Sequence, residues 1–242
     1  MKKLKFQIFG ALALTITNFS SDAGILAERT RVIYPENKRE VSLMLNNTNP
    51  YAVMTQIWID QGLGDPDKTQ APFMVLAPIF KLQPQESKGI RVIMTPNHNL
   101  PKDKESLFWV NLYEIPSVQA KSMDKNYVNM SMNTQIKLIY RPQHIVALDV
   151  EQLYKQLIIS HQYAEDTLKL EIRNPSVHYV SMAQLAIYLD GKVVKAEETE
   201  LMLSPEGSQR YTFNGVRASQ SQELQLILID DQGQHYPFKH PL

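Results

Sequence analysis

The sequence has no cysteine, which excludes disulfide bonds and thiolate metal sites and leaves hydrophobic cores to stabilise the chain. It also has no excess of charge, because 25 basic residues balance 25 acidic ones, so nothing favours binding to nucleic acid or to an anionic membrane. After the first 23 residues, no apolar run is long enough to cross a bilayer. These absences exclude several classes of protein before any motif is considered.

The motifs of common enzymes are lacking too. There is no Gly-x-Ser-x-Gly nucleophile motif, no glycine-rich phosphate loop, and no His-x-His or His-Glu-x-x-His pair that could hold a metal. The histidines are scattered along the chain, at His98, His144, His161, His178, His235 and His240. Asp65-Pro66-Asp67 is typical of a loop turn, since the ligand spacing of a calcium loop does not continue after it. We therefore expect no catalytic residue, no metal and no cofactor.

The first 23 residues have the layout of a secretory signal peptide. Three lysines precede an apolar run from Phe6 to Ile16, which is too short to span a bilayer as an uncleaved anchor. Ser21-Asp22-Ala23 then offers small residues at the positions that a signal peptidase reads. We expect cleavage after Ala23 and a soluble, exported protein that does not insert into a membrane.

The remaining chain suits two domains. The signal segment takes three lysines and one aspartate with it, which leaves 22 basic and 24 acidic residues among 219. Two domains of roughly 110 residues fit that length. Arg141-Pro142-Gln143-His144 interrupts the hydrophobic pattern and predicts a hinge. We place one domain at residues 24–142 and the other at residues 143–242.

Alternation of apolar and polar residues predominates after residue 30, with almost no helical period. Turn clusters such as Asn46-Asn47-Thr48-Asn49-Pro50 and Asp190-Gly191 separate short apolar runs. Strands are predicted at 31–34, 41–45, 53–59, 73–76, 79–82, 89–95, 107–113 and 127–140, and in the second domain at 168–172, 183–189, 193–194, 211–213 and 224–229. This spacing is typical of antiparallel sandwiches, which makes the fold class all-β.

The stretch from Tyr127 to Tyr140 is longer than a strand of a compact domain usually is. From Asn126 to Ile136 it also lacks the charge, proline or glycine that would protect a sheet edge from pairing with another chain. Two interpretations remain open. It is either an ordinary sandwich strand that ends earlier than its pattern, or an edge kept free for an incoming segment of another protein.

Three segments resemble the PapD-like periplasmic pilus chaperones. The longest is Leu100 to Pro116, which is similar to the signature segment of that family. Thr30 to Tyr34 resembles the family's first strand, and Ile136 to Pro142 resembles the end of its subunit-binding strand. The resemblance covers residues 24–242 in the right order and is weaker after Arg141.

This resemblance implies two immunoglobulin-like β-sandwiches arranged as a boomerang. Such a protein holds fimbrial subunits in the periplasm by donor-strand complementation and delivers them to an outer-membrane usher. The implied donor residues are Val128, Met130 and Met132. The implied anchor for the subunit's C-terminal carboxylate is the pair Arg31 and Lys137. An interdomain ionic cluster is implied at Glu105, Arg141 and Asp231, with Asp230 as the competing assignment.

Each implied site also has a simpler interpretation. Arg31 and Lys137 could be solvated edge residues, the methionines could fill a core, and the charges of the cluster could lie apart on the surface. The loop from Ser117 to Asn126 leaves the subfamily open. An uncovered edge would favour self-association of the free protein as a capping dimer. The alternative function from another class is a structural subunit or adhesin of a surface fibre.

Overall fold

The computed structural model describes residues 24–68, 71–96, 99–116, 130–189, 191–218 and 222–242. The expected signal segment, residues 1–23, lies outside the described residues, and so does Val128. Within the described residues, strands predominate and form two sandwiches, each with its own hydrophobic core. The expected all-β fold of two domains is confirmed.

The N-terminal sandwich packs a four-stranded sheet on a five-stranded one. The first sheet has the order β1 (Ile25–Ala27), β3 (Glu40–Asn47), β7 (Ser87–Met94), β5 (Phe73–Leu76). The second has the order β2 (Arg31–Pro35), β9 (Met132–Arg141), β8 (Ser106–Pro116), β4 (Val53–Asp60), β6 (Ile79–Leu82). A short 3-10 helix, η1 (Pro66–Lys68), lies in the connection between β4 and β5.

Alternating residues of these strands build the first core, as the period-2 pattern predicts. On β9, Ile136, Leu138 and Tyr140 are buried. Phe73 lies at the centre of the aromatic part of this core, with ring centroids 5.1 Å from both Tyr34 and Phe108 in edge-to-face geometry. Such contacts fix the spacing of the two sheets.

The C-terminal sandwich has sheets of three and five strands. One sheet has the order β10 (Ile158–Ala164), β11 (Thr167–Arg173), β15 (Ser208–Asn214). The other has the order β13 (Lys192–Lys195), β12 (Val180–Leu189), β16 (Gln222–Ile229), β17 (His235–Pro241), with β14 (Met202–Leu203) also paired to β12. The predicted hairpin across positions 190–191 is present, since Leu189 pairs with Lys192.

Several elements differ from the sequence prediction. Helix α1 (Val150–Gln156) and the strands β1, β10 and β14 were not expected, and β17 follows the strand that the pattern indicated as the last one. The long strand predicted at residues 127–140 is β9, which begins at Met132. Of its predicted first residues, 127–129 lie outside the described residues, and Met130 and Ser131 are described but are not part of the strand.

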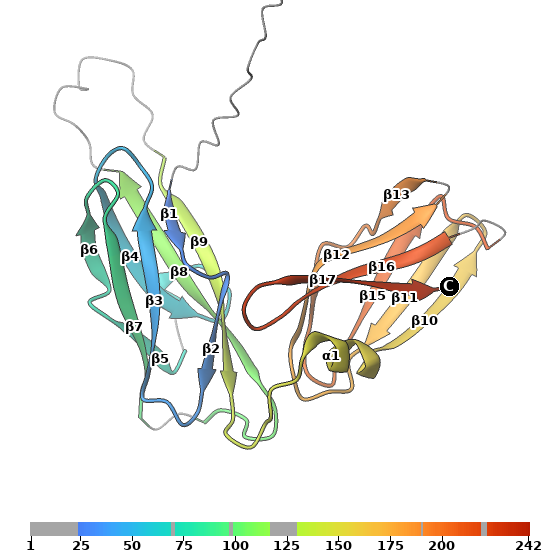
Figure 1. Cartoon of the computed structure of the whole chain (residues 1–242), viewed down its shortest axis with the longest axis horizontal. Coiled ribbons are helices and arrows are strands. Elements are labelled where there is room, and N and C mark those ends of the chain that lie inside the picture. The colour runs from blue at the N-terminus through green and yellow to red at the C-terminus, as the bar shows by residue number, and fades with distance from the viewer. Residues whose placement is uncertain (1–23, 69–70, 97–98, 117–129, 190, 219–221) are drawn as a thin grey trace, which may run out of the picture.

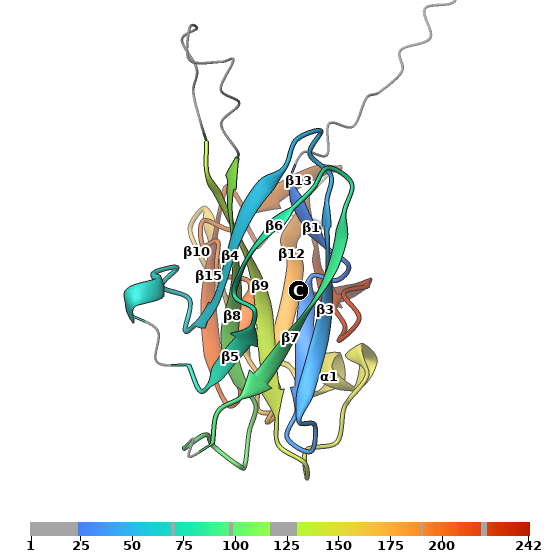
Figure 2. The same cartoon turned by 90° about the vertical axis from the view of Figure 1, so that its left-hand side faces the viewer.

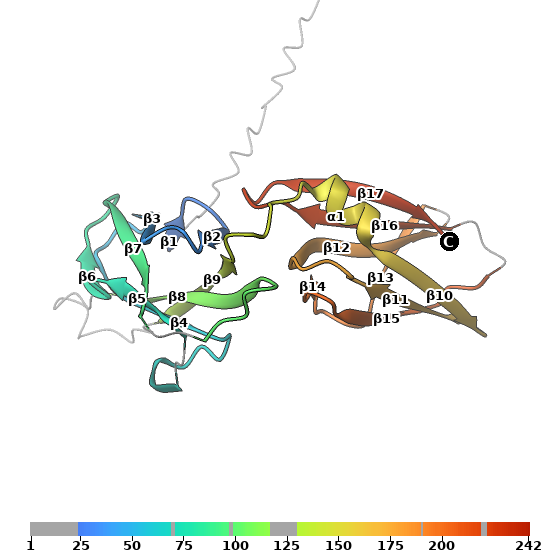
Figure 3. The ribbon, with the colours of Figure 1, turned by 90° about the horizontal axis from the view of Figure 1, so that it is seen from below.

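The two sandwiches are the arms of a bent molecule, and the chain crosses between them after β9 (Figure 1). Figure 3 shows the two layers of each sandwich, with β3 and β8 in opposite layers of the first. The turn between β16 and β17 reaches towards β2 and β9 of the other arm. A Cβ atom placed on Gly233 in this turn would lie only 2.7 Å from Oγ1 of Thr30, so the two arms meet closely there.

Candidate functional site: a free strand edge beside two cations

The edge of β9 is covered along only part of its length. Residues Lys137 to Arg141 pair in parallel with β2, from Arg31↔Lys137 to Pro35↔Arg141. Residues Met132 to Ile136 pair only with β8 on the other side, and no described strand lies on their outer edge. The cause is that β1, at residues 25–27, pairs with β3 in the other sheet. Only β2, from Arg31 onward, pairs with β9 on this side. In Figure 2, β8 and β9 extend together towards the end of the sandwich.

Arg31 and Lys137 lie at the point where this free edge ends. They are direct partners in the register of β2 and β9, so their backbones are about 4.8 Å apart. Arg31 is only 4% exposed, and its Nε has no hydrogen-bond partner. Nζ of Lys137 lies 5.7 Å from the centroid of the Trp109 ring, a cation–π contact. No carboxylate among the described residues forms an ion pair with either side chain.

Burial lowers the pKa of both cations. For Arg31 the lowering by desolvation is opposed by the charges of Asp231 and Asp230. For Lys137 desolvation is reinforced by the charge of Arg31 and opposed by Glu200. The site therefore holds two partly desolvated positive charges side by side, an arrangement suited to an anionic ligand.

The donor residues that the structure describes lie where the apolar face of β9 passes beyond the core. Met130 is 77% exposed and Met132 is 45% exposed, whereas Ile136 on the same face is buried. Two exposed methionines next to an unpaired edge give an apolar surface without a partner in the described part of the chain. Methionine is unbranched and soft, which suits a surface that must fit variable partners.

Glu105, Arg141 and Asp231 meet at the junction of the two arms. Nε of Arg141 donates to Oε1 of Glu105 at 2.5 Å, and its two terminal nitrogens donate to Asp231 at 2.7 and 3.1 Å. Oε2 of Glu105 accepts from the backbone N–H of Tyr179 at 2.7 Å. The competing residue, Asp230, instead accepts from the N–H groups of Gln232 and Gln234 within its own turn. Burial raises the pKa of Glu105, and Arg141 opposes that rise.

Comparison with known proteins places both arms in one family. The model for "Pili and flagellar-assembly chaperone, PapD N-terminal domain" matches residues 24–146. The model for "Pili assembly chaperone PapD, C-terminal domain" matches residues 152–239. The chain belongs to the PapD-like pilus chaperones.

Relatives and solved structures agree with this assignment. The chaperone is 30% identical over 230 residues to the probable fimbrial chaperone YehC of Escherichia coli K12, covering 93% of this chain and 91% of that one. It is 33% identical over 183 residues to the chaperone FocC of Escherichia coli, covering 74% and 77%. The crystal structure of the YadV chaperone matches with a TM-score of 0.73 at 25% identity, over 90% of this chain and 99% of that one. The CupB2 chaperone of Pseudomonas aeruginosa matches with a TM-score of 0.71 at 28% identity, over 90% and 100%.

The family decides between the functions that the sequence left open. The protein is a fimbrial chaperone of the chaperone-usher type, and the alternative of a fibre subunit or adhesin is not favoured. Pilus chaperones act by binding and are not enzymes.

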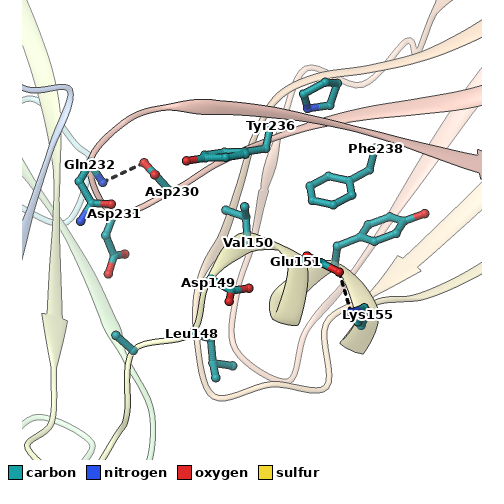
Figure 4. A pocket seen from close by; sticks show the side chains of 13 residues that line it. Leu148, Asp149, Val150, Glu151, Lys155, Asp230, Asp231, Gln232, Tyr236 and Phe238 are labelled. Carbon is teal, nitrogen blue, oxygen red and sulfur yellow. Dashed lines mark hydrogen bonds and ion pairs between the residues drawn. The ribbon is translucent and has the colours of Figure 1, made fainter.

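A further cavity lies beside α1, β17 and the turn that carries Asp230 and Asp231. It has a volume of about 680 Å³ and combines apolar walls, such as Val150 and Phe238, with four carboxylates. Figure 4 shows two of these acids with their partners, Glu151 with Lys155 and Asp230 with the N–H of Gln232. Asp149 accepts from the N–H of Gln152, and Asp231 pairs with Arg141. No group of three His, Asp or Glu in the described residues could hold a metal ion. No described helix has the length and hydropathy needed to cross a membrane.

Several residues of these sites were missed by the sequence reading. Trp109 carries no cation–π signature in a linear sequence, and Tyr179 contributes a backbone group that any residue could supply. Lys104 also links the two arms, through an exposed pair with Glu206 at 3.1 Å. None of these contacts has a local sequence pattern, because each depends on how distant segments meet.

Proposed function

We propose that this chaperone works in the periplasm, after removal of residues 1–23, and holds a pilus subunit by adding β9 to the subunit's incomplete sheet. It then delivers the subunit to an outer-membrane usher. Residues 24–142 form the subunit-binding domain in this proposal, and residues 143–242 form the second domain. The observation that carries the proposal is that the free edge of β9 ends at the pair Arg31 and Lys137.

The geometry of that end favours a C-terminal carboxylate. A segment paired with Met132 to Ile136 would lie in line with β2 and would be stopped by Arg31, where β2 begins. An incoming segment fits beside Met132 to Ile136 if its chain ends before it reaches Arg31. Two partly desolvated cations at the stop favour an end with negative charge, which would gain short charge-assisted hydrogen bonds. The bound segment would then run towards Lys137, parallel to β9.

The exposed methionines supply the other half of the proposed mechanism. Main-chain hydrogen bonds along the free edge would provide affinity, and alternate side chains of β9 would fill the apolar groove of the subunit. In an extended strand the period-2 pattern would direct Met130 and Met132 into this groove, and it predicts the same for Val128, which lies outside the described residues. Ser131 and Asn133 would then face away from the groove.

Co-purification of a pilus subunit with paired variants of the chaperone tests this proposal. Met130→Asp places a charge in the apolar groove, where it cannot be solvated, so subunit recovery should fall to background. Ser131→Asp is the matched control, because Ser131 is exposed and lies one residue away on the opposite face. Its recovery should stay near that of the wild type. Equal losses for the two variants would contradict donation of alternate side chains by this strand.

A further inference from the structure

The side chain of Glu114 is a buried carboxylate for which neither sandwich packing nor subunit binding gives a reason. It lies near the C-terminal end of β8, directly opposite Met132, and it is 7% exposed. Its Oε2 accepts from the backbone N–H of Ile25 at 3.1 Å and from Nδ2 of Asn49 at 3.4 Å. Its Oε1 accepts no hydrogen bond from any described residue.

Gly24 is held next to this unoccupied oxygen. Its carbonyl accepts from both the backbone N–H and the Oγ1 of Thr48, at 3.0 and 2.8 Å. Its φ is +143°, and a Cβ atom at this position would lie 3.4 Å from Oε1 of Glu114 and 3.1 Å from Cε of Met132. The backbone here therefore requires glycine, and the Cα of Gly24 lies close to the carboxylate.

We propose that Glu114 is the binding site for the α-ammonium group of Gly24. This inference rests on the proposed removal of residues 1–23, because only that cleavage turns the amide nitrogen of Gly24 into a cation. The nitrogen is one bond from the Cα that lies beside Oε1. With the carbonyl of Gly24 fixed by Thr48, rotation about the Cα–C bond would bring a free amine towards the place that a Cβ atom would occupy, next to Oε1, without moving β1.

An ion pair between the Gly24 ammonium and Glu114 would offset the electrostatic cost of burying this carboxylate. Burial raises the pKa of Glu114, and the hydrogen bonds from Asn49 and Ile25 only oppose that rise, so an ionised Glu114 without a cation opposes folding at neutral pH. An ammonium group at Gly24 would reverse the sign of this contribution. Export and cleavage would thus stabilise the N-terminal sandwich, and the first residue would be fixed against Met132 at the free edge of β9.

Four forms of residues 24–242 test the proposal, with the α-amino group of Gly24 either free or acetylated, and with residue 114 as Glu or Gln. Acetylation restores a neutral amide and removes the charge. In the free-amine protein Glu114→Gln should lower the midpoint of thermal unfolding by about 4 °C or more. In the acetylated protein the same substitution should leave the midpoint unchanged or raise it. The same shift in both backgrounds would overturn the proposal.

The pH dependence of acetylation provides a second readout. The ordinary pKa of an α-amino group is about 7.7 to 8.0, and a carboxylate partner raises it in the folded state. Stability from the pair is therefore present below about pH 8 and lost as the pH rises through the raised value. Acetylation of the Glu114 protein should lower the midpoint at pH 6.5 and lose this effect at high pH; a pH-independent effect would contradict the ion pair. Mass spectrometry of the exported protein tests the cleavage site separately, so the two ideas can fail independently.

Discussion

At the scale of single residues, the two cations where the free edge of β9 ends are unfavourable for the free protein. Arg31 is buried with an unpartnered Nε, and Lys137 lies beside it with a pKa lowered by burial. Like charges held together in a partly desolvated site oppose folding unless an anion is bound. If the subunit supplies the anion, the two charges serve binding at the expense of folding. Loss of either charge should then raise the stability of the free chaperone and lower its affinity for the subunit.

Lys137→Met should therefore stabilise the free chaperone while it weakens subunit binding. The methionine keeps an apolar stem against Trp109 but removes one of the two charges that face the proposed carboxylate. Loss of one partner of a desolvated charged pair typically costs on the order of 2 to 5 kcal/mol of binding free energy. Arg31→Ala should weaken binding similarly. Isothermal titration with a subunit's C-terminal peptide measures the binding, and calorimetry measures the stability.

The pH dependence of these proteins checks the cause. Because the pKa of Lys137 is lower in the folded chain, its charged form opposes folding at neutral pH, and this effect vanishes above the ordinary lysine pKa of about 10.4. The stability difference between Lys137→Met and the wild type should narrow as the pH rises through the lysine range. A Lys137→Met protein that binds the peptide as tightly as the wild type would show that the anchor lies elsewhere.

Sequence alone could indicate these residues but not their environment. Arg31 and Lys137 belong to segments that resemble a known family, whereas the burial of Arg31 follows from the pairing of β2 with β9. The choice between Asp230 and Asp231 was also beyond the sequence, since both belong to one turn. Asp230 accepts from N–H groups of that turn, which leaves Asp231 to Arg141.

At the scale of elements, β9 has two distinct halves. Residues 137–141 lie between β2 and β8, and residues 132–136 have β8 on one side alone. The sequence predicted an unprotected edge because this stretch lacks charge, proline and glycine, but it could not show where the edge ends. That point is set by the change of β1 and β2 from one sheet to the other, which no pattern within β9 reveals.

Amide hydrogen exchange should separate these halves. In the dilute free protein, peptides covering residues 132–136 should exchange much faster than peptides covering 137–141, because edge amides directed away from β8 lack a described partner. Addition of a subunit should protect the first half and leave the second unchanged. If the free protein caps its edge by dimerising, protection of residues 132–136 should instead rise with protein concentration. Equal exchange of the two halves at every concentration would contradict a free edge.

Two of the elements that the sequence missed, α1 and β17, have specific causes. Helix α1 is only seven residues long, too short for a clear period, although Asp149 and Gln152 form a capping box that marks its start. Strand β17 contains Pro237 and ends at Pro241, and it lies at the edge of its sheet, where a strand tolerates proline. Its exposed residues lack the alternation that identified the inner strands.

At the scale of the whole molecule, the ionic cluster connects the proposed binding strand to the second arm. Arg141 is the last residue of β9, Glu105 precedes β8, and Asp231 lies in the turn between β16 and β17. Glu105 also accepts from the N–H of Tyr179, so it contacts both arms. The cluster should therefore fix the angle between the sandwiches, and with it the position of Asp231 relative to Arg31.

Replacement of Glu105 should loosen this angle. The side chains of Glu105 and Arg141 are only 1% and 12% exposed. Glu105→Ala leaves Arg141 with Asp231 alone and the N–H of Tyr179 without its acceptor, so it should cost about 1 to 3 kcal/mol of stability. Asp231→Ala should cost less, since Asp231 is 31% exposed and Arg141 keeps Glu105.

Because the chain has no cysteine, spin labels on Lys81→Cys and Lys192→Cys report one distance between the arms. The distance distribution should be narrow in the wild type, broader in Glu105→Ala, and broadest when Asp231→Ala is added. Lys104→Ala is the matched control, because it removes the exposed interdomain pair with Glu206, and exposed pairs contribute little. An equally narrow distribution in all of these proteins would mean that other contacts hold the arms, and that the cluster serves only the stability of the N-terminal sandwich.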